Sequence, residues 1–134
     1  MARRPLSPHL SVYRFAYTMA LSILHRATGL ALSLGLLLFC GWLVAVASGP
    51  GCYESFARFA ASWPMRLIIA GGVIAFCYHL LNGIRHLVWD LGAGLERPQA
   101  RRSARIVVVA TVLLSAALLW IFFSGHFSGP GATP

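Results

Sequence analysis

The sequence predicts an all-α membrane protein with three transmembrane helices. Of its 134 residues, 58% are hydrophobic and 10% are charged, and the mean hydropathy of +0.74 excludes an ordinary soluble domain. The few charges are clustered, since Asp, Glu, Lys and Arg are absent from residues 27–53, 67–84 and 106–134. Each of these runs is about the length that crosses roughly 30 Å of hydrocarbon as a helix. A single membrane-anchor domain, residues 1–134, accounts for the whole chain.

The first half of the chain is predicted to hold an arm, a helix and a loop. Residues 1–17 contain Pro5 and Pro8, which disfavour a continuous helix, so we expect an extended arm there. The first helix is predicted over about 18–47, because the turn-forming sequence "SGPG" follows it. Residues 48–62 are expected to form a short loop on the far side of the membrane.

The second half is predicted to hold two helices and a tail. Ser62 and Pro64 are suited to the cap and first turn of a second helix over about 63–91, which "GAG" ends. The polar sequence "LERPQARRSAR" is expected to be a loop that leads to a third helix over about 104–124. A flexible tail is expected over 125–134.

The arginines predict the orientation in the membrane. All 11 basic residues are arginines, and nine of them precede the first apolar run or lie around the loop between the second and third. Only Arg58 and Arg66 belong to the other loop, so the positive-inside rule places the N-terminus and residues 91–105 in the cytoplasm or matrix. The net charge of +8 thus reflects topology, and we expect no nucleic-acid partner.

The N-terminal sequence and the cysteines bear on location and cofactors. The N-terminus resembles neither a signal peptide nor a transit peptide, which favours a bacterial cytoplasmic membrane, with a mitochondrial inner membrane as the alternative. The cysteines form neither a CxxC pair nor a C-x-x-C-H haem attachment motif. Cys40 and Cys77 fall inside predicted helices, where we expect them to pack as apolar side chains.

Two polar stripes interrupt the apolar helices. Both stripes repeat with the offsets of one helical face, and a membrane helix gains nothing by pointing such a face at lipid, so we expect both to face a protein interior or a site. The first consists of Ser22, His25, Arg26, Gly29 and Ser33, and the second of His79, Asn82, Gly83, His86 and Asp90.

The depths of these residues suggest a haem. At a rise of ~1.5 Å per residue, His79 is expected roughly 9 Å deeper in the membrane than the cluster of His25, Arg26 and His86. A haem has a matching chemistry, because its iron takes a neutral imidazole and its anionic propionates suit arginine and histidine near water. The small residues one turn either side of His79, Ala75 and Gly83, are expected to leave room for the flat macrocycle.

Simpler interpretations stand beside this one. His79 could make an interhelical hydrogen bond, and His25 and His86 could snorkel to the membrane surface. The small residues Gly29, Ser33, Ala75 and Gly83 could be close-packing positions between helices.

Three sequence blocks in order, "RPLSPHLSVYR", "SILHRATG" and "YHLLNGIRHLVWDLG", resemble the cytochrome b membrane-anchor subunits of succinate dehydrogenase, complex II of respiration. The resemblance implies that His79 is an axial ligand of haem b and that Ser22 and Arg26 line a ubiquinone pocket. It also implies that His25 and Arg26 approach the haem propionates. His86 belongs to the third block and is expected near them.

The resemblance also implies partners. A six-coordinate haem needs a second imidazole, which is expected from a companion membrane subunit that completes the helical bundle. Electrons are expected from a flavoprotein through an iron–sulfur subunit, and this chain is expected to have no succinate active site. The alternatives are the anchor of a fumarate reductase, which uses the same parts in reverse, and a haem-free structural anchor. A transporter or channel is disfavoured, because the far-side halves of the helices are nearly bare of polar groups.

Overall fold

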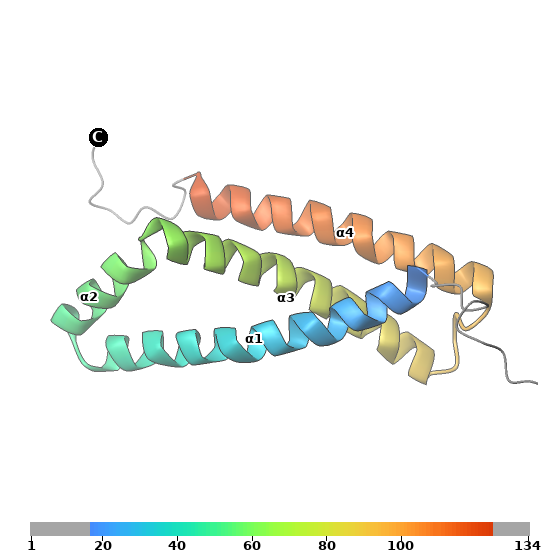
Figure 1. The fold of residues 1–134 in the computed structure, drawn as a ribbon, viewed down its shortest axis with the longest axis horizontal. Coiled ribbons are helices and arrows are strands. Elements are labelled where there is room, and N and C mark those ends of the chain that lie inside the picture. The colour runs from blue at the N-terminus through green and yellow to red at the C-terminus, as the bar shows by residue number, and fades with distance from the viewer. Residues whose placement is uncertain (1–16, 125–134) are drawn as a thin grey trace, which may run out of the picture.

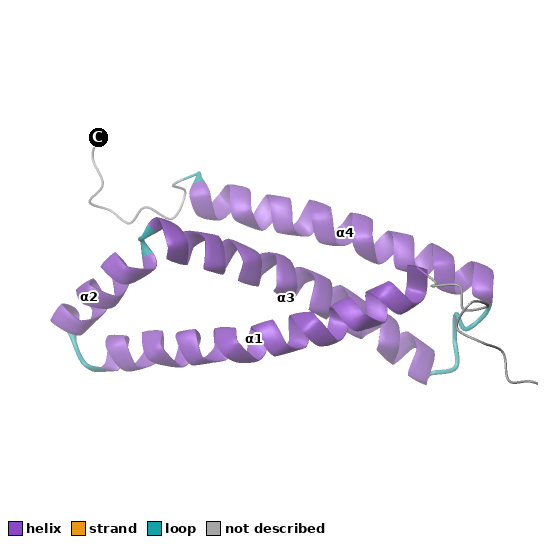
Figure 2. Ribbon diagram, in the orientation of Figure 1, coloured by secondary structure: helices purple, strands orange, loops and turns teal. Residues whose placement is uncertain are grey.

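The computed structural model describes residues 17–124, which form four helices joined by short turns (Figure 1). The described chain contains no strand (Figure 2). The helices are α1 (Tyr17–Ala47), α2 (Pro50–Ala60), α3 (Trp63–Asp90) and α4 (Arg97–Phe123). Helices α1, α3 and α4 are long and apolar enough to cross a membrane, so the predicted fold class is confirmed. The predicted arm, apart from Tyr17, and the predicted tail lie outside the described residues.

Helix α3 is central to the arrangement. It lies between α1 and α4, and the N-terminal half of α1 crosses it, while the far ends of α1 and α3 diverge and are bridged by α2 (Figure 1). Tyr78 donates a hydrogen bond of 2.6 Å to the Leu21 carbonyl, which ties α3 to α1. Both residues are buried with Ala104 and Val107 of α4, so all three spans meet in one small core.

Most large apolar side chains outside this core face outward. Leu37 on α1 and Trp120 on α4 are 69% and 73% exposed, respectively. Outward apolar faces on helices of this length are what lipid or neighbouring membrane helices cover. The chain is therefore a multi-pass membrane protein whose own core is small.

The prediction of a loop over residues 48–62 is wrong for most of that range, because residues 50–60 form α2. Pro50 stands in the first helical turn, where its missing N–H costs nothing, and Gly49 precedes it with a φ of 100°. The sequence "SGPG" thus ends α1 and also begins α2. The aromatic side chains of α2, Tyr53, Phe56 and Phe59, recur at helical spacing that a loop prediction overlooks.

The third span begins earlier than predicted, at Arg97 rather than near 104. Glu96 is the N-cap and Pro98 lies in the first turn, a position that suits proline. Arginine and glutamine are good helix formers, so the polar segment continues the helix beyond the hydrocarbon instead of forming a loop.

The predicted signals around α3 are largely confirmed. The helix ends at Asp90, and Gly92 and Gly94 of the "GAG" sequence adopt φ values of 77° and 74°, which favour glycine. Ser62 occupies the N-cap position. Its hydroxyl, however, donates to the Phe59 carbonyl at 2.7 Å and caps no α3 amide.

Candidate functional site

Three histidines gather where α1 crosses α3. The imidazoles of His25 and His79 stack with a centroid distance of 4.0 Å and an interplanar angle of 12°. The His86 ring lies 5.3 Å from that of His25. We call His25, His79 and His86 the histidine site. The two polar stripes thus face each other through their histidines.

Two glycines allow this approach. A Cβ atom added at Gly29 would lie 3.1 Å from Cε1 of His79, and one added at Gly83 would lie 3.8 Å from Cε1 of His25. Each imidazole therefore packs over a glycine of the opposite helix. Gly83 was expected to make room for a macrocycle, but in this structure the His25 ring covers it.

The predicted depth difference between His79 and His25, roughly 9 Å, is too large. The contacts of His79 with Gly29 and of His25 with Gly83 fix an antiparallel register in which His79 stands one turn beyond His25, about 6 Å along the axis. Side chains close the remaining gap, so the rings touch. The sequence argument placed the membrane boundary separately on each helix and treated the axes as parallel, whereas α1 crosses α3 (Figure 1).

The hydrogen bonds of His79 define which of its nitrogens carries the proton. Its Nδ1 lies 3.2 Å from the His25 carbonyl oxygen and 3.3 Å from Thr28 Oγ1. Because a carbonyl oxygen can only accept, Nδ1 is the donor in this contact, and the neutral imidazole then has its lone pair on Nε2. A backbone carbonyl behind Nδ1 is the usual support of a metal-binding histidine. Sequence reasoning missed Thr28, which lies one turn beyond His25 in "HRATG".

His25 has unused hydrogen-bonding capacity. Its Nδ1 is buried and has no hydrogen-bond partner among residues 17–124. A buried polar atom left in this state costs about 1–3 kcal/mol, so a group that offers it a hydrogen bond is stabilised here.

Ser22 and Arg26 flank the histidines on α1. The Ser22 side chain is half-buried and the Arg26 side chain is exposed. Ser33, which ends the predicted stripe, is exposed and donates to the Gly29 carbonyl of its own helix at 3.0 Å, so it does not extend the site.

The second predicted stripe divides between two faces of α3, and Asn82 does not belong to the histidine site. Arg85 is 6% exposed and donates to Ser103 Oγ at 3.0 Å, Asn82 Oδ1 at 3.3 Å and the Ala100 carbonyl at 3.1 Å. Its guanidinium carbon lies 3.9 Å above the Trp89 ring. We call these five residues the Arg85 clasp, which joins α3 to α4. Sequence reasoning missed it because Arg85 was counted only among the charges that set topology.

Asp90, the last residue of that stripe, is exposed at the end of α3 and lies apart from the site. Trp89 connects the two clusters, because its ring packs edge-on against His86 at 5.2 Å and its Nε1 donates to the Gly94 carbonyl at 3.1 Å. Within the described part of the chain, no group of three histidine, cysteine or acidic side chains could hold a metal ion. The histidine site offers a metal one oriented imidazole nitrogen, at His79.

Comparisons with known proteins identify the family of this chain. Residues 1–118 match the family described as succinate dehydrogenase/fumarate reductase transmembrane subunit. The chain is 42% identical over 120 residues to the succinate dehydrogenase cytochrome b556 subunit of Paracoccus denitrificans, a match that covers 90% of this chain and 92% of the relative. It is 44% and 46% identical over 122 residues to the mitochondrial cytochrome b560 subunits of Sus scrofa and Mus musculus, covering 87% of this chain and 70% of each relative. The predicted resemblance is therefore confirmed, and the chain belongs to the family of succinate dehydrogenase/fumarate reductase transmembrane subunits.

Proposed function

We propose that this chain is the membrane-anchoring cytochrome b subunit of a succinate:quinone oxidoreductase, in which it helps to bind haem b and ubiquinone. The observation that carries the proposal is the orientation of His79, whose Nδ1 faces the His25 carbonyl at 3.2 Å. That contact supports an Nε2 lone pair directed away from α1, which is the form in which histidine ligates iron. The cytochrome b names of the relatives supply the cofactor class.

The residues around His79 fit a haem. His79 Nε2 would supply one axial ligand, and a companion membrane subunit would supply the other. His25, with its unpartnered Nδ1, and Arg26 are the donors proposed for the propionates, with His86 beside them. When bound, haem b supplies a one-electron carrier inside the membrane. The chain's own contribution is to hold the ligand imidazole rigidly, through the Thr28 and His25 contacts.

Ser22 and Arg26 are proposed to bind the quinone. A quinone carbonyl gains negative charge as it is reduced, and a hydroxyl together with a guanidinium can donate hydrogen bonds to that oxygen. Both residues lie within a turn or so of His25 on α1, which keeps the quinone close to the haem pocket. Their hydrogen bonds would orient the quinone ring.

The arginine-rich side is proposed to face the cytoplasm or matrix. Nine of the 11 arginines precede the first apolar run or lie around the loop between the second and third spans, and the positive-inside rule assigns the side with such an excess to the cytoplasm or matrix. The flavoprotein and iron–sulfur subunits would dock on this side, where Ser22 and Arg26 also lie. The membrane is proposed to be a bacterial inner membrane, with the mitochondrial inner membrane as the alternative.

A reduced-minus-oxidised visible spectrum of the complex purified from its native membrane tests the proposal. We expect a b-type haem signal together with flavin and iron–sulfur subunits. A complex that has those subunits but no haem would reduce the chain to a structural anchor. If the chain purified without a flavin subunit and without an iron–sulfur subunit, that result would contradict the succinate dehydrogenase assignment.

A further inference from the structure

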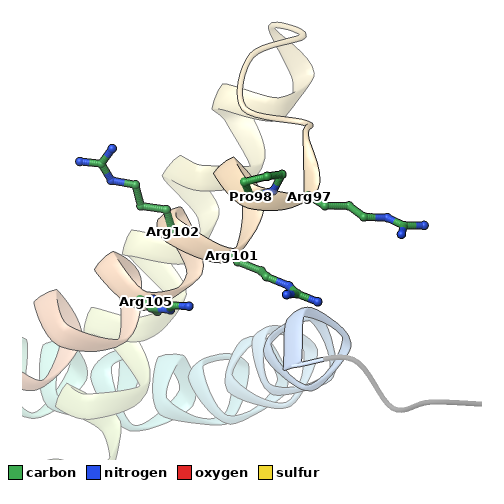
Figure 3. Close-up of a pocket in the computed structure, with 5 residues that line it drawn as sticks. All are labelled: Arg97, Pro98, Arg101, Arg102 and Arg105. Atoms are coloured by element: carbon green, nitrogen blue, oxygen red, sulfur yellow. The ribbon is translucent and has the colours of Figure 1, made fainter.

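The first turns of α4 carry a concentration of positive charge for which the proposed function names no ligand. A surface hollow of about 510 Å³ is lined by five residues of this segment, four of them arginines (Figure 3). They are Arg97, Pro98, Arg101, Arg102 and Arg105. All four arginines are exposed, and Figure 3 shows their guanidinium groups held apart around the helix. We name these four arginines the α4 arginine cluster.

The charge of this cluster is not balanced within the chain. The whole sequence has three acidic residues, and of these only Glu96 adjoins the cluster in sequence. Like charges on adjacent turns repel one another, which disfavours the arrangement unless anions compensate it. An anionic ligand would therefore be bound with a favourable electrostatic contribution.

The length of α4 places the cluster at the depth of lipid headgroups. The helix has 27 residues, or about 40 Å at ~1.5 Å per residue, against a hydrocarbon thickness of roughly 30 Å. The surplus of about 10 Å falls at the polar N-terminal end, because residues 106–123 carry no charge. Arg97 to Arg102 thus extend through the headgroup layer, and Arg105 lies at its inner edge.

The surface below the cluster is apolar and faces outward. Val109, Val112 and Leu113 follow Arg105 at helical spacing, and they are 57%, 60% and 66% exposed. A surface with cations at headgroup depth and an apolar face directly beneath matches a phospholipid, whose phosphate and acyl chains have the same vertical order. A soluble acidic protein would reach the arginines but would leave this apolar face uncovered.

We propose that the α4 arginine cluster is a binding site for an anionic phospholipid of the leaflet on this side of the membrane. Its phosphate oxygens accept hydrogen bonds from the guanidinium groups, and its chains lie along Val109 and Leu113. Arginine suits this role because its planar fork can bind phosphate oxygens in pairs.

The test compares lipid retention by the complex in nanodiscs made of phosphatidylcholine with a minority of phosphatidylglycerol. Native mass spectrometry after partial delipidation counts the lipids that remain bound. We expect the wild-type complex to retain phosphatidylglycerol in preference to phosphatidylcholine, and the double variant R101Q/R105Q to lose that preference, by about five-fold for each arginine. The control is R58Q/R66Q, which removes the same charge on the other side of the membrane and should leave retention unchanged.

Three outcomes would overturn the proposal. If the wild-type complex showed no preference for phosphatidylglycerol, the proposal would be wrong, and this measurement needs no variant. An equal loss in both double variants would show a general charge effect. If R101Q/R105Q kept its lipid but released the soluble subunits, the cluster would be a protein-docking surface. The charge-conserving variant R101K/R105K should keep most of the preference, because a lysine still binds phosphate as a point charge.

Discussion

The two polar clusters of the membrane-spanning region differ in how completely their hydrogen-bonding groups are used. In the Arg85 clasp, all three guanidinium nitrogens donate to acceptors on α3 or α4. Only Asn82 Nδ2 lacks a described partner there. In the histidine site, His25 Nδ1 is buried without a described partner, and His79 makes its hydrogen-bond contacts through Nδ1.

This difference separates a cluster that holds helices together from one that has capacity for a ligand. Each cluster has one buried side-chain atom without a described partner, so the contrast rests on what the other groups do: Arg85 joins α3 to α4 by two hydrogen bonds, whereas the imidazoles of the histidine site mainly contact one another. Trp89 contacts both Arg85 and His86, so the clasp also sets the position of one wall of the histidine site. If the comparison is correct, changes in the two clusters should affect different properties.

The largest effect is expected at His79. The variant His79→Ala should lower haem content per flavin by more than about ten-fold, since even the loss of a group that only supports a ligand costs that much in metal affinity. Membrane insertion should persist, because the apolar spans are unchanged. Haem and flavin absorbance of the purified complex measures both properties. Normal haem content would remove His79 from the ligand assignment and, with it, the contrast between the clusters.

A smaller effect, confined to quinone chemistry, is expected at Arg26. The variant Arg26→Ala should lower quinone reduction about ten- to hundred-fold, the usual value of a hydrogen bond from a charged group. Dye-linked succinate oxidation by the same preparation should be unchanged and serves as the control. Equal losses in the two assays would mean that Arg26 matters for assembly rather than for the quinone.

Changes in the Arg85 clasp should lower the stability of the protein but leave its haem spectrum unaltered. The variant Arg85→Ala leaves Asn82 Oδ1 and the Ala100 carbonyl without their donor, which should lower the free energy of unfolding by about 1–3 kcal/mol. Thermal or denaturant unfolding in detergent measures this, and Arg66→Ala, which removes an exposed arginine of the same helix, is the matched control. A haem spectrum altered as strongly as by His79→Ala would show that the clusters are not separate.

Sequence reasoning anticipated the histidine site better than it anticipated the clasp, for physical reasons. His25, His79 and His86 lie on faces defined by helical spacing, and spacing is visible in sequence. Asn82 follows His79 by three residues, an offset that falls to one side of the face, and its direction is seen only in its hydrogen bond with Arg85, which in turn contacts α4.

Interhelical register and helix ends were harder to predict. The depth of His79 depends on the crossing of α1 over α3, which no single helix encodes. Pro50 and Pro98 were interpreted as loop residues, although a proline fits the first turn of a helix as well. Family resemblance supplied the class of cofactor, whereas the Thr28 contact that orients His79 is visible only in three dimensions.

The smallest expected effect tests the close approach that brings the histidines together. In Gly29→Ala the new Cβ would lie 3.1 Å from Cε1 of His79, so the imidazole must shift by a few tenths of an ångström. Gly35→Ala on the same helix meets nothing within 4 Å and is the matched control. Alanine favours the helical conformation over glycine by about 1 kcal/mol, so Gly35→Ala should be neutral or stabilising.

Gly29→Ala should gain the same helix preference but displace the His79 imidazole. This would appear as a shifted haem absorption band or midpoint potential with full haem content. Identical spectra for the two variants would mean that the α1–α3 contact at Gly29 relaxes when the complex assembles, and that the register seen here does not set the position of His79.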